Sequence, residues 1–107
     1  MKNLPKPPVS LTTAAKKWWQ KVVQGWVLDD PALLVLQAAL EAFDRMKAAA
    51  ALVEEHGIVA PDRWGQLKIN PAVLVERDSR AAMLAGLKQL GLDLEPLHEK
   101  PGRPPGK

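Results

Sequence analysis

The sequence predicts an all-α fold of three helices, with a long central helix and a short β-hairpin or ordered loop before the last helix. Three observations support this prediction. Apolar residues recur at steps of three and four in three segments of the chain. Capping residues and prolines mark where these segments begin, and glycines mark where they end. Residues that favour strands are confined to two short runs between the second and third segments.

The first predicted helix runs from about residue 13 to residue 25, with Thr12 or Ser10 as its N-cap. The preceding residues, 1–9, hold three prolines and two lysines, so we expect an extended, mobile and basic arm there. The apolar residues of this helix recur at positions that share one face. They are Ala15, Trp19, Val22, Val23 and Trp26.

The central helix is predicted from Pro31 to about His56, because Asp29 or Asp30 caps its start and Gly57 follows its end. Its length is about 39 Å at 1.5 Å per residue. Two apolar stripes run side by side along it, and a chain of 107 residues has few other elements to cover both. We therefore expect another subunit to cover part of this helix. The first stripe holds Leu33, Leu36, Leu40, Phe43, Met46, Ala50 and Val53, and the second holds Leu34, Ala38, Ala42, Ala49 and Leu52.

Residues 58–60 and 67–69 are short β-prone runs on either side of a segment rich in turn-forming residues. They predict a small hairpin or an ordered loop. The last helix follows over residues 71–90, with Asn70 as its N-cap and Gly91 after its end.

The last helix carries Arg77 and Arg80 on a predicted apolar face. Because a guanidinium group on such a face needs a partner, we predict that both arginines pair with acids of the central helix. The candidate partners are Glu41 and Asp44, within one subunit or between subunits. The same face holds Val73, Leu84 and Leu87.

Residues 10–91 therefore form one predicted domain, between the arm and a flexible tail of residues 92–107 that is rich in proline and glycine. Charge is distributed unevenly along the chain. Residues 1–28 contain five lysines and no acid (+5), whereas residues 29–56 contain six acids and two basic residues (−4). The basic part suits a polyanion, and the acidic part suits a basic surface, including that of another copy.

No catalytic site, metal site or cofactor is predicted. The chain has no cysteine, which excludes disulfides and thiolate metal sites and fits a reducing cytosol. The two histidines, His56 and His98, are 42 residues apart and have no ligand pattern around them. No phosphate-binding loop or nucleophile elbow is present. The longest apolar stretch is interrupted by charged residues and is too short to span a bilayer, so no membrane contact is expected.

An ordered set of short motifs resembles the terminase small subunits of tailed double-stranded DNA phages, specifically the P-twenty-seven-type group. The resemblance covers most of the chain, from about Pro7 to Pro105, and the order and spacing of the motifs carry it. Relatives often have an acid in the first turn of the first helix, where this chain has Thr13-Ala14-Ala15. The motifs are Leu11-Thr12, Ala15-Lys16 and Trp19, Asp29 or Asp30, Gly57-Ile58-Val59, Gly65, Asn70-Pro71-Ala72, Arg77, Leu90-Gly91-Leu92 with Pro96, and Gly102-Arg103-Pro104-Pro105.

This resemblance implies a role without catalysis. Small terminases form rings that recognise viral double-stranded DNA, and they recruit and regulate the large subunit, which holds the ATPase and the nuclease. The expected partners are therefore viral DNA, the large terminase subunit and further copies of the chain, in the cytoplasm of a bacterial host. The tail is a candidate docking segment for the large subunit.

Basic residues at the start of the chain and around the predicted hairpin are the candidates for DNA contact, since each phosphate that they neutralise adds salt-sensitive affinity. Trp18 is expected either at a packing contact or near DNA, and DNA contact is the alternative for the two arginines of the last helix. The predicted DNA-binding residues are Lys2, Lys6, Lys16, Lys17, Lys21, Arg63 and Lys68. The predicted oligomer interface contains Leu33, Leu36, Leu40, Phe43, Arg77 and Arg80.

Two other functions fit parts of the sequence. A helix-turn-helix transcription regulator would use the first helix and the start of the second, but a helix of this length after residues 25–28 makes a poor recognition helix. A helical adaptor without a nucleic-acid role would bind no DNA even at low salt.

The ring hypothesis makes a direct prediction for native mass spectrometry of the purified protein. We expect a single closed oligomer well above a tetramer, without DNA and with linear duplex DNA. A monomer or a plain dimer would favour the regulator or the adaptor instead.

Overall fold

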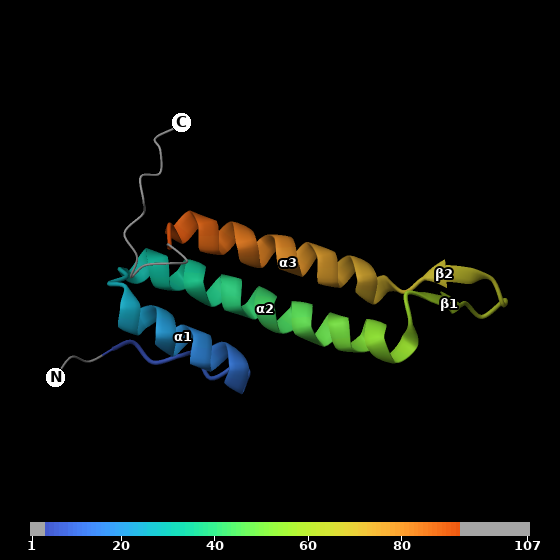
Figure 1. Ribbon diagram of the computed structural model, residues 1–107, viewed down its shortest axis with the longest axis horizontal. Helices are drawn as coiled ribbons and strands as arrows, with labels where there is room; N and C mark the ends of the chain where they lie inside the picture. Colours follow the sequence, from blue (N-terminus) through green and yellow to red (C-terminus); the bar gives the residue numbers. More distant parts are fainter. Residues whose placement is uncertain (1–3, 93–107) are drawn as a thin grey trace, which may run out of the picture.

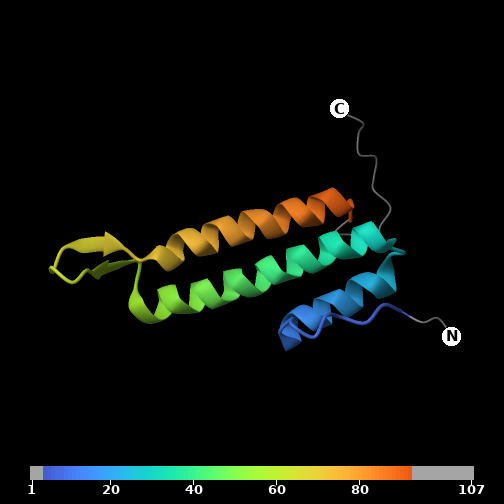
Figure 2. The ribbon, with the colours of Figure 1, turned by 180° about the vertical axis from the view of Figure 1, so that it is seen from behind.

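The computed structural model describes residues 4–92, which form three helices and one small sheet. Helices α2 and α3 run antiparallel as a long helical hairpin, and the β-hairpin projects beyond one end of it (Figure 1). Helix α1 lies along α2 at the other end, and the view from behind shows the same arrangement (Figure 2). The elements in chain order are α1 (Thr13–Gly25), α2 (Asp30–His56), β1 (Val59–Pro61), β2 (Leu67–Ile69) and α3 (Pro71–Leu90).

Each helix begins at a side chain that caps it, and these caps confirm the predicted helices. Thr12 Oγ1 accepts a hydrogen bond from the Ala15 amide at 3.2 Å, and Asp29 and Asn70 cap α2 and α3 in the same way. Asn70 has a second role, because its side-chain amide donates to the Gly57 carbonyl at 2.9 Å. This bond joins the residues on either side of the β-hairpin. The hairpin itself is antiparallel, with Val59 opposite Ile69.

The largest apolar cluster lies between α1 and α2. Leu36 of α2 is fully buried there, next to Trp19 of α1. A polar contact fixes the same two helices, because the carboxylate of Asp44 accepts from the Thr12 backbone amide at 3.0 Å and from its hydroxyl at 2.6 Å. The buried members of the cluster are Leu11, Ala15, Trp19, Val22, Val23, Leu36 and Leu40.

Small residues line the contact between α2 and α3. Ala42 and Ala49 of α2 are buried, and so are Ala72 and Ser79 of α3, at spacings of seven. Gly86 continues this spacing, and a Cβ atom placed on it would lie only 3.0 Å from Cβ of Ala39. A seven-residue repeat keeps one seam facing a neighbouring helix, and small side chains let the two backbones approach closely. We call this contact the small-residue seam.

A single chain covers more of the two stripes of the central helix than the sequence suggested. Helix α1 covers Leu36 and Leu40 of the first stripe, while Ala42 and Ala49 of the second are buried along the α3 side. The physical reason is that α1 and α3 pack on different sides of α2. The second stripe stays open at Leu34, Ala38 and Leu52, which are exposed.

The prediction that α3 packs through the face with Leu84, Arg77 and Arg80 was wrong. Leu84 is 53% exposed, because the face that meets α2 is the one that carries the small residues. Arg77 and Arg80 are therefore exposed, and among the described residues neither pairs with an acid of α2. Arg80 contacts Glu76 of its own helix at 2.9 Å, and Arg77 contacts the adjacent Asp78 at 3.1 Å.

A large side chain at Gly86 should separate α2 from α3. We expect Gly86→Leu to lower the free energy of unfolding by about 1–3 kcal/mol, the usual cost of overpacking. The exposed neighbour supplies the control, since Ala85→Leu adds the same side chain away from the seam. Chemical denaturation measures both, and equal stability of the two variants would contradict the close approach at Gly86.

Candidate nucleic-acid interface

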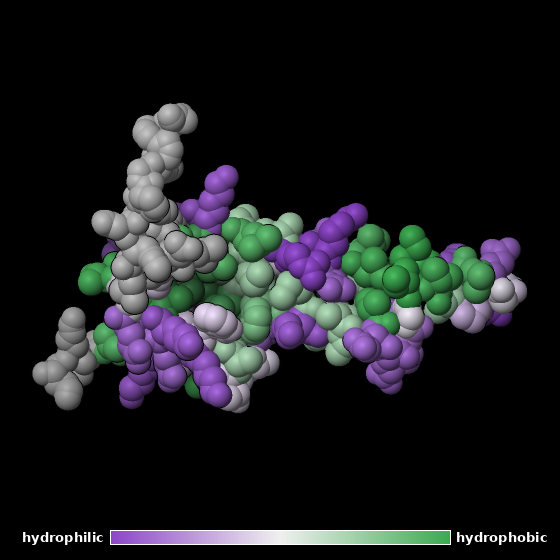
Figure 3. All heavy atoms as spheres, viewed as in Figure 1, coloured by the Kyte–Doolittle hydropathy of each residue, from purple (hydrophilic) through white to green (hydrophobic). Residues whose placement is uncertain are grey.

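Helix α1 presents a basic surface. Lys17 and Lys21 are exposed and lie one turn apart, and Lys16 is half-buried beside them. Among the described residues, none of the three lies within 4.0 Å of an acidic oxygen in an ion pair. Figure 3 shows hydrophilic residues gathered over this helix. The three ammonium groups are therefore available to an anion in solution.

Trp18 lies at the border of this surface. Its side chain is 51% exposed, and Lys21 Nζ lies 5.4 Å from the centroid of its ring. A cation at this distance is attracted by the electrons of the ring face, which holds Lys21 over the helix. The adjacent Trp19 is buried, as its position in the helical repeat predicts.

The N-terminal arm is described from residue 4 onward and has no helix or strand in that part. It is anchored to α1 because the indole nitrogen of Trp19 donates to the Pro5 carbonyl at 2.9 Å. Lys6 follows this contact along the chain and is exposed. Lys2 falls outside the described residues.

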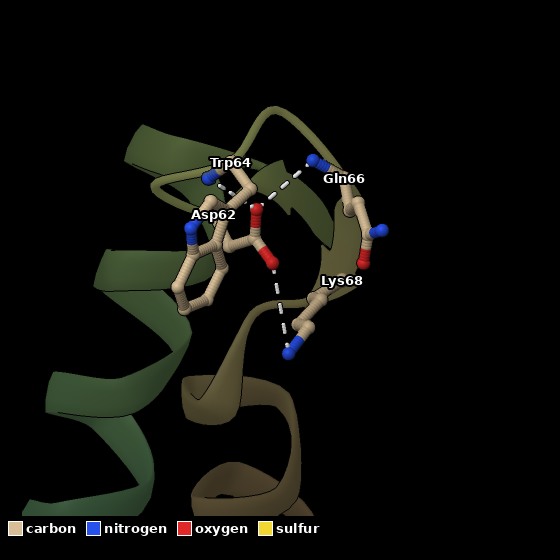
Figure 4. A network of polar contacts seen from close by, with 4 residues as sticks. All are labelled: Asp62, Trp64, Gln66 and Lys68. Carbon is tan, nitrogen blue, oxygen red and sulfur yellow. Dashed lines mark hydrogen bonds and ion pairs between the residues drawn. The ribbon is translucent and has the colours of Figure 1, made fainter.

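The β-hairpin tip is organised by one carboxylate (Figure 4). Asp62 Oδ1 accepts from the backbone amides of Trp64 and Gln66 at 2.8 and 2.9 Å. Gly65 has φ = 82°, a backbone conformation that glycine adopts without strain, and its amide donates to the Asp62 carbonyl at 3.0 Å. A tight turn followed by a left-handed glycine is a common three-residue hairpin loop. Sequence reasoning missed this role of Asp62, although an aspartate at the start of a turn that ends in glycine signals it.

The two predicted basic residues of the hairpin differ in their surroundings. Arg63 is exposed, and its guanidinium carbon lies 4.8 Å from the ring centroid of Trp64, which is 73% exposed. Lys68 Nζ lies 3.6 Å from Asp62 Oδ2, a distance too long for a hydrogen bond but close enough for charge attraction. Arg63 therefore presents the freer charge.

The structure does not bring the predicted DNA-binding residues together. The lysines of α1 and the hairpin tip lie towards opposite ends of the long axis of the molecule (Figure 1). Hydrophobic residues gather between them, over the hairpin and the adjoining helix ends (Figure 3). A single compact ligand cannot contact both basic regions of one chain.

The family model described as phage terminase, small subunit, matches residues 15–96, which is most of the chain. The chain belongs to the phage terminase small subunit family. Membership confirms the resemblance seen in the motifs and supports a role in phage DNA packaging. Small terminases are generally non-catalytic subunits. Comparisons with curated proteins and with solved structures gave no match.

Other features of this small terminase chain bear on its chemistry. Within residues 4–92, no group of three or more His, Cys, Asp or Glu side chains is placed to hold a metal ion. In the same part of the chain, no helix is both long and apolar enough to cross a membrane. His56 is exposed, and its Nε2 lies 3.8 Å from a carboxylate oxygen of the adjacent Glu55.

The residues predicted for the small terminase oligomer interface fall into three groups. Leu36 and Leu40 are buried within the chain, in the apolar cluster between α1 and α2. Leu33 and Phe43 pack on the edge of that cluster and are only partly buried. The two arginines of α3 are exposed. Sequence reasoning missed the exposed apolar face of the hairpin, which contains Val59, Leu67 and Ile69.

Removal of the Asp62 carboxylate should open the hairpin tip. Hydrogen bonds to a charged acceptor contribute roughly 1.5–3 kcal/mol, so we expect Asp62→Ala to speed hydrogen exchange at the amides of Trp64 and Gln66 while amides of the helices stay protected. Gln66→Ala is the control, because only its backbone amide takes part. Unchanged exchange in Asp62→Ala would refute this account of the turn.

Proposed function

We propose that this small terminase engages viral double-stranded DNA through the basic surface of α1, and that it recruits and regulates the large terminase subunit as a ring of identical chains in the host cytoplasm. The observation that carries the proposal is the group of three lysines on α1, which lie in a stretch of 28 residues without an acid. This group occurs in a chain whose family acts in DNA packaging.

Electrostatics support this surface as a DNA contact. Lysines that neutralise phosphates release counterions from the duplex, and this release supplies sequence-independent affinity. A few lysines in one chain bind weakly, whereas several copies in one ring act together and bind far more tightly. The acidic α2 lies behind α1, and its acids lower the net charge of the chain to +3. The positive charge on the exposed side of α1 is therefore greater than this net charge suggests.

The hairpin is a second proposed contact. Arg63 and Trp64 together offer a charge for a phosphate and a ring for a base or an apolar pocket. Because this tip lies far from α1, we assign it to a different segment of DNA or to the large subunit. Lys68 has the weaker claim, since Asp62 already attracts it.

Ring assembly draws on surfaces that the chain leaves exposed. Leu34 and Leu52 are 69% and 47% exposed, and the hairpin adds further apolar side chains. The partly exposed Leu33 and Phe43 and the exposed arginines of α3 remain proposed interface residues. Family membership favours this function over a transcription regulator or an adaptor.

Loss of the α1 lysines should weaken DNA binding. We expect Lys16→Ala, Lys17→Ala and Lys21→Ala together to reduce affinity for duplex DNA and to flatten the plot of log affinity against log salt by about 0.9 for each phosphate that is no longer neutralised. Fluorescence anisotropy with labelled duplex at several salt concentrations measures both quantities.

The matched control removes three positive charges from exposed sites elsewhere, with Arg45→Ala, Lys47→Ala and Lys88→Ala. The control should keep most of the salt dependence. If both triple variants lose affinity equally, net charge and not the α1 surface drives binding. Unchanged binding in the α1 variant would discard this surface.

A further inference from the structure

An apolar groove of about 500 Å³ lies where the three helices meet. Trp18 and Trp26 of the α1 region form one wall, and Met83 and Leu87 of α3 form the other. Leu36, Leu40, Phe43 and Met46 of α2 form the floor, and Lys21 stands at the edge. Figure 3 shows hydrophobic residues next to the hydrophilic ones that gather over α1.

This groove has the size and lining of a binding site. Pockets that hold small ligands measure roughly 300–1,000 Å³ and are mostly apolar with a few polar groups at the edge. The polar character here comes from Lys21, so a suitable occupant combines apolar side chains with a nearby negative charge. Part of the lining stays in contact with water, because Trp18 is exposed and Met83 and Leu87 are only partly buried. Covering these apolar side chains is favourable, which favours an occupant.

The path of the chain points to one occupant. Gly91 ends α3 with φ = 70°, and Leu92, the last described residue, already lines the groove. The sequence continues as Asp-Leu-Glu-Pro-Leu-His-Glu over residues 93–99. At a maximum of about 3.5 Å per residue, Leu94 reaches about 7 Å and Leu97 about 17 Å beyond Leu92. Both leucines are therefore within reach of the groove.

Charge complementarity favours the same occupant. Residues 93–99 contain three acids and no lysine or arginine, whereas α1 contains three lysines and no acid. Lys21 lies at the groove, and Lys17 lies one turn away on the same helix. The family match also extends to residue 96, so the first part of this segment belongs to the region shared with other small terminases.

We propose that residues 93–99 dock in the apolar groove of their own chain, with Leu94 and Leu97 against its apolar walls and the acids beside Lys17 and Lys21. The docked segment covers part of the basic surface of α1. It therefore competes with DNA for the same lysines, a consequence that rests on the function proposed above. Departure of the segment exposes the groove and the lysines together.

Engineered disulfides test the docking directly, because the 107-residue chain has no cysteine of its own. Met83→Cys with Leu97→Cys joins the groove to the segment, and Leu84→Cys with Leu97→Cys is the matched control on an exposed neighbour. We expect the first pair to form an intramolecular disulfide at least about tenfold faster, because docking raises the local concentration of the two thiols.

Each other outcome of the disulfide experiment contradicts the proposal. Equal rates for the two pairs would show that residue 97 does not prefer the groove. Disulfide-linked dimers in place of linked monomers would show that the segment of another copy occupies it. Mixing isotopically labelled and unlabelled chains before oxidation distinguishes the two kinds of link by mass.

A second pair of variants tests the competition with DNA. Leu94→Asp with Leu97→Asp should release the segment and raise affinity for duplex DNA several-fold, while Leu94→Met with Leu97→Met keeps the apolar contact and the affinity. Fast oxidation of the Met83 pair without this rise would overturn the competition and leave docking in place. The lysine variants of α1 test the proposed function independently of docking. Unchanged DNA binding by those variants would reject the α1 surface as the DNA contact, whatever the disulfide experiment shows.

Discussion

The close approach of α2 and α3 along the small-residue seam determines how the other elements lie. Gly86 leaves room for Ala39, because a Cβ atom added there would lie only 3.0 Å from the Cβ of Ala39, and Ala42, Ala49 and Ser79 continue the contact. Because the two helices pair along their length, the β-hairpin that joins them must project beyond their common end (Figure 1). The large apolar residues of α2 are then free to face α1, so small and large side chains serve two different neighbours of one helix.

The second contact, between Thr12 and Asp44, gives α1 its orientation. Asp44 of the negatively charged central helix accepts both bonds from Thr12, the residue that caps the basic helix, at 3.0 and 2.6 Å. The apolar face of α1 is buried against Leu36 and Leu40, and its lysines are left on the outer side. Positive and negative charges are thus separated onto two helices that touch, and the basic one faces solvent. That separation gives α1 a local positive surface despite the modest net charge of the chain.

Local signals and long-range packing differ in how well the sequence predicts them. Caps and terminal glycines act within a few residues, so the helix limits at Thr12, Asn70 and Gly91 could be predicted from the sequence. The packed face of α3 could not be predicted from the sequence. A search for a buried helix face looks for large apolar residues, whereas the small-residue seam uses glycine, serine and alanine. Within the described chain, Arg77 and Arg80 pair with Asp78 and Glu76 of their own helix. The predicted partners, Glu41 and Asp44, lie far away in the sequence. The α1 lysines were recognisable as a group from composition, but the separation of α1 from the β-hairpin that carries Arg63 depends on the fold (Figure 1).

Asn70 links the direction of the hairpin to the start of α3. Its side-chain oxygen accepts from the Ala72 amide, its side-chain nitrogen donates to the Gly57 carbonyl, and its backbone amide donates to the Ile58 carbonyl at 2.7 Å. Asn70 thus connects the β-hairpin to both helices, at the end of α2 and the start of α3. The direction of the β-hairpin is therefore coupled to the first turn of α3 through the hydrogen bonds of Asn70. Redesign of the hairpin angle therefore has to rebuild the beginning of α3 at the same time.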